Sequence, residues 1–401
     1  MLPALPMPSC KVYIVYQWNL TALPHDKRRL SLLFVDIFAK LSFPRFWRII
    51  RMPHQVTTII IGAGPIGLEL AANLKQANVH YLHFDTGQVG QTISWYPKQA
   101  HFFSSPDRIA ICGLPLQTQD QTKATREEYL TYLRTVVQQH RLKINTYEKI
   151  TEIKTLGHHQ FEVITDKDTY HAENVITCIG DMHLPRKINV PGEDLPHVSH
   201  YFDEAHKYFD QKLLIVGGKN SAVEAAIRCH RIGAKVSISY RQAMFNEKSI
   251  KYWLLPEIQW LIETKEIGFY PQSIVKRITP KTVEMESLNG EQQVDADFVL
   301  LLTGYEMDTT LLKQAGVTLQ GPNRAPMFDD ATMQTNVPGL YVAGTAAAGT
   351  QNKFKLFIEN CHCHVVKIIR DLLDQEPQFV NPLAYVHLKE TIPPTDRMPE
   401  S

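Results

Sequence analysis

The sequence predicts an α/β protein made of two three-layer domains, each built on a parallel β-sheet. Two observations predict this fold. At residues 57–76 a short apolar, β-branched run leads directly into a glycine-rich turn and then into a helical stretch, and the same plan recurs at 212–232. Such runs are typical of parallel strands buried on both faces. A strand, a glycine turn and a helix in this order are typical of Rossmann-like units.

The composition is that of an ordinary globular protein. Of 401 residues, 44% are hydrophobic and 21% are charged, and this length allows about two or three domains. There are 42 Lys and Arg against 41 Asp and Glu, so the sequence offers no basic footprint for nucleic acid. Six cysteines without a CxxC pair indicate a reducing, intracellular setting, and we expect a cytoplasmic protein.

The two ends of the chain differ in character from the rest. Residues 1–51 lack the basic start, apolar run and small-residue cleavage site of a signal peptide. Their apolar stretch at 28–51 is interrupted by charges and a proline, well short of the roughly 20 residues that span a bilayer. We expect a non-functional or poorly ordered extension upstream of a start at Met52, with an amphipathic helix on a membrane surface as the alternative. We expect the tail, 376–401, to be a loose end.

The first glycine turn has the spacing of a dinucleotide-binding site. Gly62 permits the tight turn, Gly64 lets the backbone approach a pyrophosphate, and Gly67 lets helix and strand pack closely. The helix that follows offers its unpaired N–H groups and positive dipole end to the phosphates. Asp85 follows the next strand, close to where this motif carries its acidic residue, and a carboxylate there can accept hydrogen bonds from ribose hydroxyls.

The second turn, GGKNSA at 217–222, departs from the strict spacing. Lys219 occupies the second glycine slot, where its side chain either points away from the pyrophosphate or reaches a phosphate as a cation. Arg241 follows the next strand, at a spacing similar to that of Asp85 in the first unit. An arginine there pairs with a 2′-phosphate, whereas an acidic group would repel it, so we favour NADPH over NADH. The alternative is a solvated surface arginine.

Two dinucleotide sites in one chain suggest one tightly held flavin and one exchanging nicotinamide. Three further segments carry an apolar strand into a glycine, namely Gly180, Gly304 and Gly344. After Gly344 and a turn of small residues, we expect a last helix from about Lys353.

Together these segments resemble the flavoproteins with two dinucleotide-binding domains, which include thioredoxin reductase, glutathione reductase and relatives of flavin monooxygenase. The resemblance covers about residues 54–375. It implies an FAD domain, 52–190 and 295–375, split around an inserted NADPH domain, 191–294. The implied FAD contacts are Gly62, Gly64, Pro65, Gly67, Asp85, Gly180, Gly344 and Thr345. The implied contacts to NADPH or to the domain interface are Gly217, Gly218, Lys219, Asn220, Ser221, Ala222, Arg241 and Gly304. Thr345 stands where this family usually carries an acidic residue.

The motifs that carry the redox centre distinguish the subfamilies of these flavoproteins. The CxxC of thioredoxin reductase, the CxxxxC of glutathione reductase and the FxG-then-His fingerprint of flavin monooxygenases are all absent. The segments GGKNSAVEAAIRCHRIGAKVSISYR, LLTGYEMD, NVPGLYVAGTAAAGT and FIENCHCH are instead similar to the YpdA-type family, the proposed bacillithiol-disulfide reductases. The resemblance implies an FAD enzyme that takes hydride from NADPH and reduces the oxidised form of a low-molecular-weight thiol.

The chain departs from this family at one position. The cysteine thought to act there lies inside the first glycine turn, where this chain has Ile66. Either another thiol serves, or the flavin reduces the disulfide directly, or the acceptor differs. Cys361 is a candidate for a catalytic role, because the start of the last helix would lower a nearby thiol pKa. His364 is a second candidate, which the resemblance implies. Buried structural cysteines are the default. We expect no metal site, since the side chains of Cys361 and Cys363 diverge by about 200° on a helix.

Three other functions remain as alternatives to a disulfide reductase. They are a flavin monooxygenase-like enzyme, an NADPH-dependent ferredoxin or flavodoxin reductase, and a redox-sensing flavoprotein without fast turnover. The sequence leaves open whether the partner is a small-molecule disulfide or another electron acceptor. It also leaves the oligomeric state open, with a homo-oligomer among the options.

Overall fold

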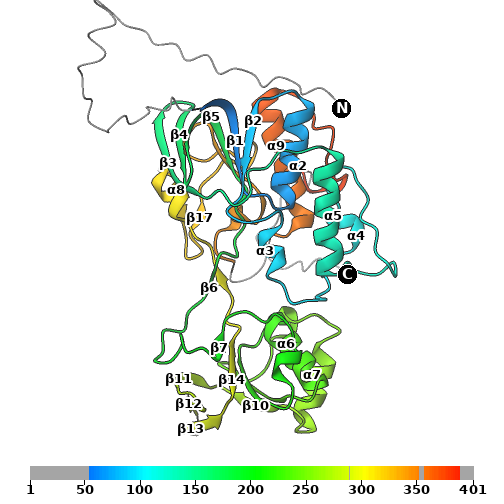
Figure 1. Ribbon diagram of the computed structural model, residues 1–401, viewed down its shortest axis with the longest axis vertical. Coiled ribbons are helices and arrows are strands. Elements are labelled where there is room, and N and C mark those ends of the chain that lie inside the picture. The colour runs from blue at the N-terminus through cyan, green and yellow to red at the C-terminus, as the bar shows by residue number, and fades with distance from the viewer. Residues whose placement is uncertain (1–53, 289, 352–355, 389–401) are drawn as a thin grey trace, which may run out of the picture. The chain divides into compact units, whose positions relative to one another are not determined.

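The computed structural model describes residues 54–288, 290–351 and 356–388 (Figure 1). All of them belong to one compact unit of the chain. The expectations for residues 1–51 and for the part of the tail beyond 388 lie outside these described residues. The described chain forms two lobes, each built around one sheet, and they are called the first and the second lobe in chain order.

The first lobe is built on a six-stranded sheet in which β5 (Thr169–Thr177) has two partners on one edge. The second half of β5 pairs in parallel with β18 (Leu340–Val342). The first half of β5 pairs antiparallel with β4 (Gln160–Thr165). The other strands are β1 (His54–Ile61), β2 (Tyr81–Phe84) and β3 (Ile150–Gly157). Because the whole second lobe lies between β5 and β18 in the sequence, the two ends of the described chain meet in one sheet.

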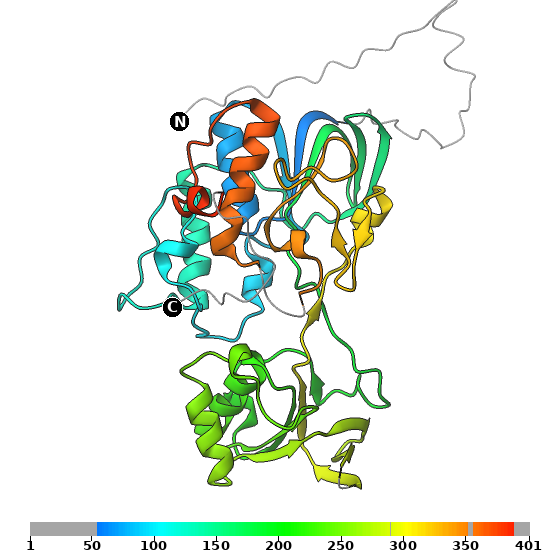
Figure 2. The same cartoon turned by 180° about the vertical axis from the view of Figure 1, so that it is seen from behind.

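Helices cover one face of the first sheet (Figures 1 and 2). They are α2 (Pro65–Gln76), α5 (Arg126–Gln139) and α9 (Ile358–Leu373), with α3 (Gln91–Ser94), α4 (Pro106–Ile109) and α10 (Leu383–His387) beside them. α2 and α9 lie side by side (Figure 2). The Thr125 side chain accepts a hydrogen bond from Glu128 N and the Glu128 carboxylate accepts one from Thr125 N, so α5 begins with a complete capping box.

The second lobe has a five-stranded sheet with only parallel pairs. Its order is β10 (Gly268–Pro271), β9 (Lys235–Tyr240), β8 (Lys212–Val216), β14 (Phe298–Leu301) and β7 (Val198–Ser199). Helices α6 (Asn220–Arg231) and α7 (Leu255–Glu263) pack on one face. The antiparallel strands β11 (Ile274–Ile278), β12 (Thr282–Ser287) and β13 (Gly290–Asp295) pack on the other. The predicted α/β fold with two sheet-based units is confirmed, and the second lobe has the three layers that the sequence predicts.

Short two-stranded ribbons complete the fold. One lies where the chain passes between the lobes, and pairs β6 (Leu184–Pro185) with β15 (Tyr305–Glu306) (Figure 1). The other pairs β16 (Leu319–Gln320) with β17 (Ala325–Pro326), next to α8 (Thr310–Gln314). A 3-10 turn, η3 (Gly344–Ala348), follows β18.

Three details differ from the sequence-based expectations. β14 pairs with β8, although the expected boundary at 295 assigns it to the FAD domain, and we propose a boundary after Leu301. α9 begins at Ile358 and not near Lys353, because the Asn360 side chain accepts a hydrogen bond from Phe357 N and caps the helix there. The start of the tail is not loose, because Asn381 is 4% exposed and donates to the carbonyls of Asp107 and Ala110.

Candidate functional site

The first glycine turn joins β1 to α2 and leaves one side of its backbone open. Gly62 has φ +106°, and a Cβ there would overlap the Cys178 carbonyl. A Cβ on Gly67 would overlap the Gly62 carbonyl, so the close packing of helix and strand requires a glycine. A Cβ on Gly64 would meet nothing within 4 Å. Gly64 is also the N-cap of α2, followed by Pro65, so this open backbone lies at the positive end of the helix.

Two side chains at the end of β2 hold this turn in place. The Asp85 carboxylate accepts hydrogen bonds from Ala63 N at 2.6 Å and from Gly87 N at 2.8 Å. Burial raises the pKa of Asp85, although both backbone bonds oppose the rise. The His83 ring lies beneath the turn, where its Nε2 donates to the Gly62 carbonyl at 2.9 Å. Burial lowers the pKa of His83 to about 4, so this ring is neutral near pH 7.

The turn after β18 meets the turn after β5. Gly180 has φ +78°, and a Cβ there would lie 3.8 Å from Thr345 Oγ1. The adjacent Asp181 is 7% exposed, and its carboxylate accepts hydrogen bonds from Gln351 Nε2 at 3.0 Å and from Thr345. Burial is the largest effect on Asp181 and raises its pKa. A carboxylate therefore lies beside Thr345 after all, supplied by another segment.

Ile66 and His364 both lie beside Gly344. A Cβ on Gly344 would lie 3.6 Å from the Ile66 side chain, so position 66 lies between the two glycine motifs of the first lobe. The His364 Nδ1 accepts a hydrogen bond from Gly344 N at 3.1 Å. Burial lowers the pKa of His364 to about 3, so the ring is neutral near pH 7. Its Nδ1 is already used in the hydrogen bond to the turn. This geometry gives His364 a positioning role.

The five described cysteines are free thiols, and four of them are fully buried. Burial raises the thiol pKa of every one of them, namely Cys112, Cys178, Cys229, Cys361 and Cys363. Cys361 is 0% exposed. A thiolate is the reactive form of cysteine, so none of these thiols is activated. Cys361 is placed near the start of α9 as expected, but its burial makes it a structural cysteine.

The second glycine turn joins β8 to α6. Gly217 has φ +149°, and a Cβ there would clash with the Leu302 carbonyl. A Cβ on Gly218 would overlap the Tyr240 ring, so this aromatic ring lies directly on the turn. α6 begins at Asn220 with Lys219 as its N-cap. The Asn220 side chain accepts a hydrogen bond from Lys251 N at 2.6 Å, which ties the turn to the loop before α7.

Three cations gather at the carboxyl end of the second sheet. Burial lowers the pKa of Lys219, and the positive charges of Arg186 and Arg241 lower it further. The three side chains come from three segments: the chain after β6, the glycine turn and the end of β9. Arg241 is thus placed where the sequence predicted. Arg186 was missed, because nothing in the sequence near it signals a nucleotide site.

The remaining predicted residues of this lobe lie around the same turn. Ser221 is exposed and Ala222 is buried in the first turn of α6. Gly304 has φ +100°, and a Cβ there would meet nothing within 4 Å. Its carbonyl accepts a hydrogen bond from Arg186 N at 2.9 Å, so Gly304 belongs to the passage between the lobes.

A buried ion pair that the sequence did not reveal joins α2 to α9. His362 Nδ1 lies 2.7 Å from Glu69 Oε2, and both side chains are 0% exposed. The other ring nitrogen, Nε2, donates to the Arg108 carbonyl at 3.1 Å. Burial alone would lower the pKa of His362, but the Glu69 charge and these hydrogen bonds outweigh it and raise the pKa. Glu69 Oε1 also accepts from Asn381 N at 2.9 Å, which explains why the tail is ordered there.

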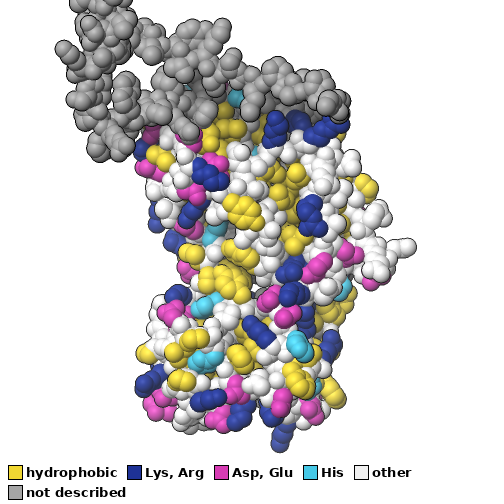
Figure 3. Space-filling view, in the orientation of Figure 1, with side chains coloured by type: hydrophobic (Ala, Val, Ile, Leu, Met, Phe, Trp, Pro, Cys, Tyr) yellow, Lys and Arg dark blue, Asp and Glu magenta, His cyan; other side chains and the backbone are white. Residues whose placement is uncertain are grey.

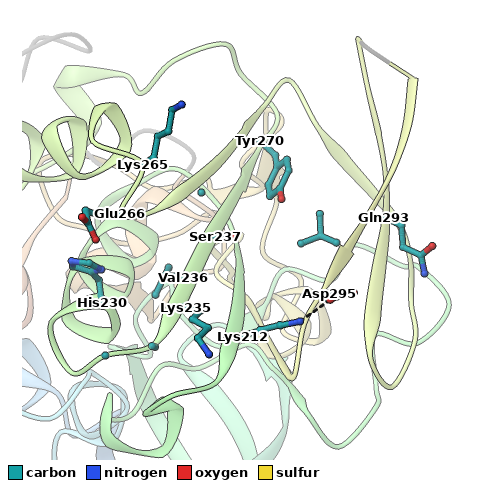
Figure 4. A pocket seen from close by; sticks show the side chains of 14 residues that line it. Lys212, His230, Lys235, Val236, Ser237, Lys265, Glu266, Tyr270, Gln293 and Asp295 are labelled. Atoms are coloured by element: carbon teal, nitrogen blue, oxygen red, sulfur yellow. Dashed lines mark hydrogen bonds and ion pairs between the residues drawn. The ribbon is translucent and has the colours of Figure 1, made fainter.

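A cavity of about 700 Å³ lies away from the glycine turns (Figure 4). It is lined by Lys212 and Lys235, the first residues of β8 and β9, and by Tyr270 of β10. A dashed line in Figure 4 marks the ion pair of Lys212 with Asp295, at 2.7 Å. Ligands of parallel sheets bind at the carboxyl ends of the strands, so this cavity at the amino ends is not a nucleotide site.

Metal clusters and membrane-spanning helices are both absent from the described part of the chain. Within it, no group of three or more His, Cys, Asp and Glu side chains is arranged to hold a metal ion. No helix among the described residues is both long and apolar enough to cross a bilayer. On the face drawn in Figure 3, basic and acidic side chains are interspersed.

Comparison with known proteins places the chain in a family. Residues 59–344 match the family described as pyridine nucleotide-disulphide oxidoreductase. The chain is 36% identical over 325 residues to the bacilliredoxin reductase Bdr of Bacillus subtilis (strain 168), an alignment that covers 80% of this chain and 99% of that protein.

Solved structures agree with this comparison. The bacillithiol disulfide reductase Bdr (YpdA) from Staphylococcus aureus has a TM-score of 0.75 and 35% identity, over 80% of this chain and 99% of its own. The enzyme of the same name from Bacillus cereus has a TM-score of 0.76 and 33% identity, over 80% and 100%. Thioredoxin reductase from T. acidophilum, with a TM-score of 0.60 and 19% identity, shares the fold. These matches confirm the resemblance drawn from the motifs, and the chain belongs to the pyridine nucleotide-disulphide oxidoreductase family.

Proposed function

We propose that this protein is an NADPH-dependent FAD oxidoreductase that reduces a low-molecular-weight disulfide of the bacillithiol disulfide type. The observation that carries the proposal is the pair of glycine turns, each open at the start of a helix and each in its own parallel sheet. Similarity to the bacillithiol disulfide reductases over 80% of the chain supports the acceptor class. The balanced reaction is NADPH + H⁺ + RSSR → NADP⁺ + 2 RSH.

The first lobe fits FAD. The backbone at Gly64 is open where a Cβ would otherwise lie, so a pyrophosphate can approach the N–H groups of α2. Bound FAD supplies the capacity to accept a hydride from NADPH and to pass two electrons on. Asp85 and His83 keep the turn in the shape that receives the pyrophosphate. Ile66, Asp181 and Thr345 line the place between the two glycine motifs, where we expect the flavin and its ribityl chain.

The second lobe fits NADPH. The positive end of α6 receives the pyrophosphate beside Gly217 and Gly218. Arg241 binds the 2′-phosphate, and Lys219 and Arg186 add positive charge around the same turn. Tyr240 lies on the turn and offers a ring face to the adenosine. Hydride transfer to the flavin needs no protein acid or base, so these residues act by holding the nicotinamide in position.

We infer that none of the thiols in the described part of the chain takes part in reducing the acceptor. The described cysteines all have raised thiol pKa values, and Ile66 replaces the family's cysteine in the glycine turn. Bound FAD, held between the two glycine motifs of the first lobe, would then supply both electrons to the disulfide without an intervening described thiol. The reaction belongs in a reducing compartment, so we propose a cytoplasmic location. Light scattering of the purified holoenzyme decides whether the active species is a homo-oligomer.

An anaerobic two-step experiment tests the proposal. The purified holoenzyme is reduced with NADPH, bacillithiol disulfide is added, and the recovery of the oxidised flavin absorbance is followed. Rapid recovery with release of two thiols per NADPH is expected. Reduction by NADPH without recovery would reject this acceptor and leave the flavoprotein assignment standing.

A second candidate acceptor is a redox protein. The chain is 26% identical over 71% of its length to a ferredoxin–NADP reductase of Ignicoccus hospitalis, and a site without an activated thiol suits such an acceptor. The Bacillus subtilis relative is named for the protein bacilliredoxin. Ferredoxin and bacilliredoxin are therefore added to the reduced enzyme in parallel, and the fastest reoxidation identifies the acceptor.

A further inference from the structure

A cavity of about 590 Å³ lies where the two lobes meet. Its lining comes from residues 99–123 of the first lobe and 224–257 of the second. Sites for small molecules have volumes of about 300–1,000 Å³ and often lie at domain interfaces. The size and the position of this cavity are therefore those of a ligand site, and the nucleotide turns described above lie outside its lining.

Lys123 gives this cavity an unsatisfied positive charge. Its Nζ is buried and has no hydrogen-bond partner among the described residues. It lies 4.8 Å from the centre of the Phe103 ring and 4.6 Å from that of Trp253. The two rings are stacked at 5.8 Å. Ring faces attract an ammonium group but leave its three N–H donors unused. A buried donor without an acceptor is unfavourable, and a bound anion would remove that cost.

The acidic groups of the cavity are already neutralised. Glu257 is held by the Arg231 guanidinium, with its closest approach at 2.6 Å. Glu224 lies 3.2 Å from Lys251 and 3.7 Å from Arg228. The cavity is thus lined by four Lys and Arg side chains and two glutamates. Both glutamates are paired with the other three cations, and neither is paired with Lys123. Burial lowers the pKa of Lys123, and the positive charge of Lys251 lowers it further, which shows the excess of positive charge at this place.

We propose that this cavity binds the disulfide acceptor and that the Lys123 ammonium pairs with a carboxylate of it. The ligand class is a small disulfide whose two halves carry carboxylates. The inference rests on the proposed function, because it takes the acceptor from there. The cavity runs along the flank of α6 at Glu224, Arg228 and Arg231, beyond the turn assigned to NADPH. Lys123 is also within electrostatic reach of Glu359 in the first turn of α9, the helix expected to face the flavin.

Binding and turnover are measured separately to test this. Isothermal titration calorimetry of the oxidised holoenzyme uses bacillithiol disulfide, the dianionic dithiodipropionate and the dicationic cystamine. The variant is Lys123→Gln, and the matched control is Lys143→Gln, which removes an exposed lysine of the first lobe outside the cavity. The flavin spectrum and the melting temperature confirm that each variant is folded and loaded.

We expect Lys123→Gln to weaken binding of both anionic disulfides by about tenfold, as for the loss of one charge-assisted hydrogen bond. Cystamine binding should stay the same or improve, the rate of flavin reduction by NADPH should not change, and Lys143→Gln should match the parent protein. Unchanged binding in Lys123→Gln, an equal loss for cystamine, or no binding of either anion to the parent protein would each overturn the inference. Binding that depends on Lys123 without reoxidation of the flavin would instead reject the proposed function.

Discussion

Ile66 shows how one residue changes the chemistry open to this site. It is 6% exposed and lies beside Gly344, where the first glycine motif of the first lobe meets the last one. The resemblance to the YpdA-type family places a cysteine at this position. An isoleucine side chain fills the space but forms no mixed disulfide. The described part of the chain offers no substitute, because every described thiol has a raised pKa.

Restoring a thiol at position 66 should create a covalent step. We expect Ile66→Cys, treated with bacillithiol disulfide, to gain the mass of one bacillithiol, while the parent protein gains none. Intact-protein mass spectrometry reads the adduct. The control is Ile59→Cys, which places a thiol at a 0% exposed position of β1. An adduct on the parent protein itself would show that another thiol is reactive and contradict the direct route.

Arg241 should decide which nicotinamide cofactor is used. We expect Arg241→Ala to raise the KM for NADPH by about tenfold to a hundredfold, the loss of one hydrogen bond to a charged group, and to leave the KM for NADH nearly unchanged. Steady-state kinetics with both cofactors measures this. Arg277→Ala, at an exposed position of β11, is the charge-matched control. Equal losses for both cofactors would place Arg241 away from the 2′-phosphate.

Single residues also show what the spacing of a sequence motif cannot predict, namely the hydrogen-bond partners of a side chain. The position of Asp85 predicted a carboxylate at the end of β2, and one is there. The two oxygens of this carboxylate accept hydrogen bonds from Ala63 N and Gly87 N. The sequence alone does not predict these two partners. His83 and Asp181 were missed for the same reason. A side chain that supports a turn is recognised by the backbone group it faces, and that group is set by the tertiary fold.

At the scale of elements, the pair of helices α2 and α9 is joined by one buried charge pair. Glu69 and His362 are both 0% exposed, and each also binds backbone groups. In the sequence His362 lies within ENCHCH, where only Cys361 and His364 were singled out as candidates and no metal site was expected. Which face of a helix a residue occupies depends on where the helix begins, since each residue turns it by about 100°. The expected start near Lys353 was more than a turn too early, so the faces could not be assigned.

Breaking this pair should destabilise the first lobe. We expect His362→Leu to lower the free energy of unfolding by about 3–5 kcal/mol, because it leaves the Glu69 charge buried without its partner. The double variant Glu69→Met with His362→Leu should recover much of the loss, because no charge is then buried. Denaturant titration of the three proteins measures this. A double variant as unstable as the single one would show that the side chains act through shape and not through charge.

At the scale of the whole molecule, the fold was largely predictable and its boundaries were not. Two strand–glycine–helix units predict two sheets with parallel strands at their centres. Both are present, although the first sheet also carries the antiparallel strands β3 and β4. The expected boundary at 295 separates β14 from its partner β8, because a buried apolar strand carries no mark of its neighbours in the sequence. The cavity between the lobes was likewise invisible, since Lys123 and Trp253 lie far apart in the sequence and meet only in the folded chain.

Buried histidines should make the protein sensitive to acid. The pKa of His83 is lowered to about 4 and that of His364 to about 3, whereas the unfolded chain titrates near 6.5. Below about pH 6.5 the unfolded state binds more protons, so each histidine removes about 1.4 kcal/mol of stability per pH unit until its folded pKa is reached. Above about pH 6.5 the histidine is neutral in both states, and its contribution to the free energy of unfolding is fully present. His362, with a raised pKa, acts oppositely and stabilises at low pH.

Denaturant titrations at pH 6.5 and 5.5 measure this slope. We expect His83→Gln, which keeps an N–H donor toward the Gly62 carbonyl but does not titrate, to reduce the loss of stability between these two pH values by about 1 kcal/mol. Lys143→Gln serves again as a control that changes charge without burial. An unchanged slope in His83→Gln would mean that the His83 ring is hydrated in the folded protein.

The two partners of β5 have a consequence for the order of folding. β5 finds its antiparallel neighbour β4 almost at once, but its parallel neighbour β18 follows only after the whole second lobe. During synthesis the second lobe, whose sheet is continuous in sequence from β7 to β14, is therefore complete while the first sheet still lacks a strand. Contacts of such long separation form slowly, and an open edge invites other strands. The exposed edge of β5 is where a nascent or truncated chain would associate, and β18 closes it.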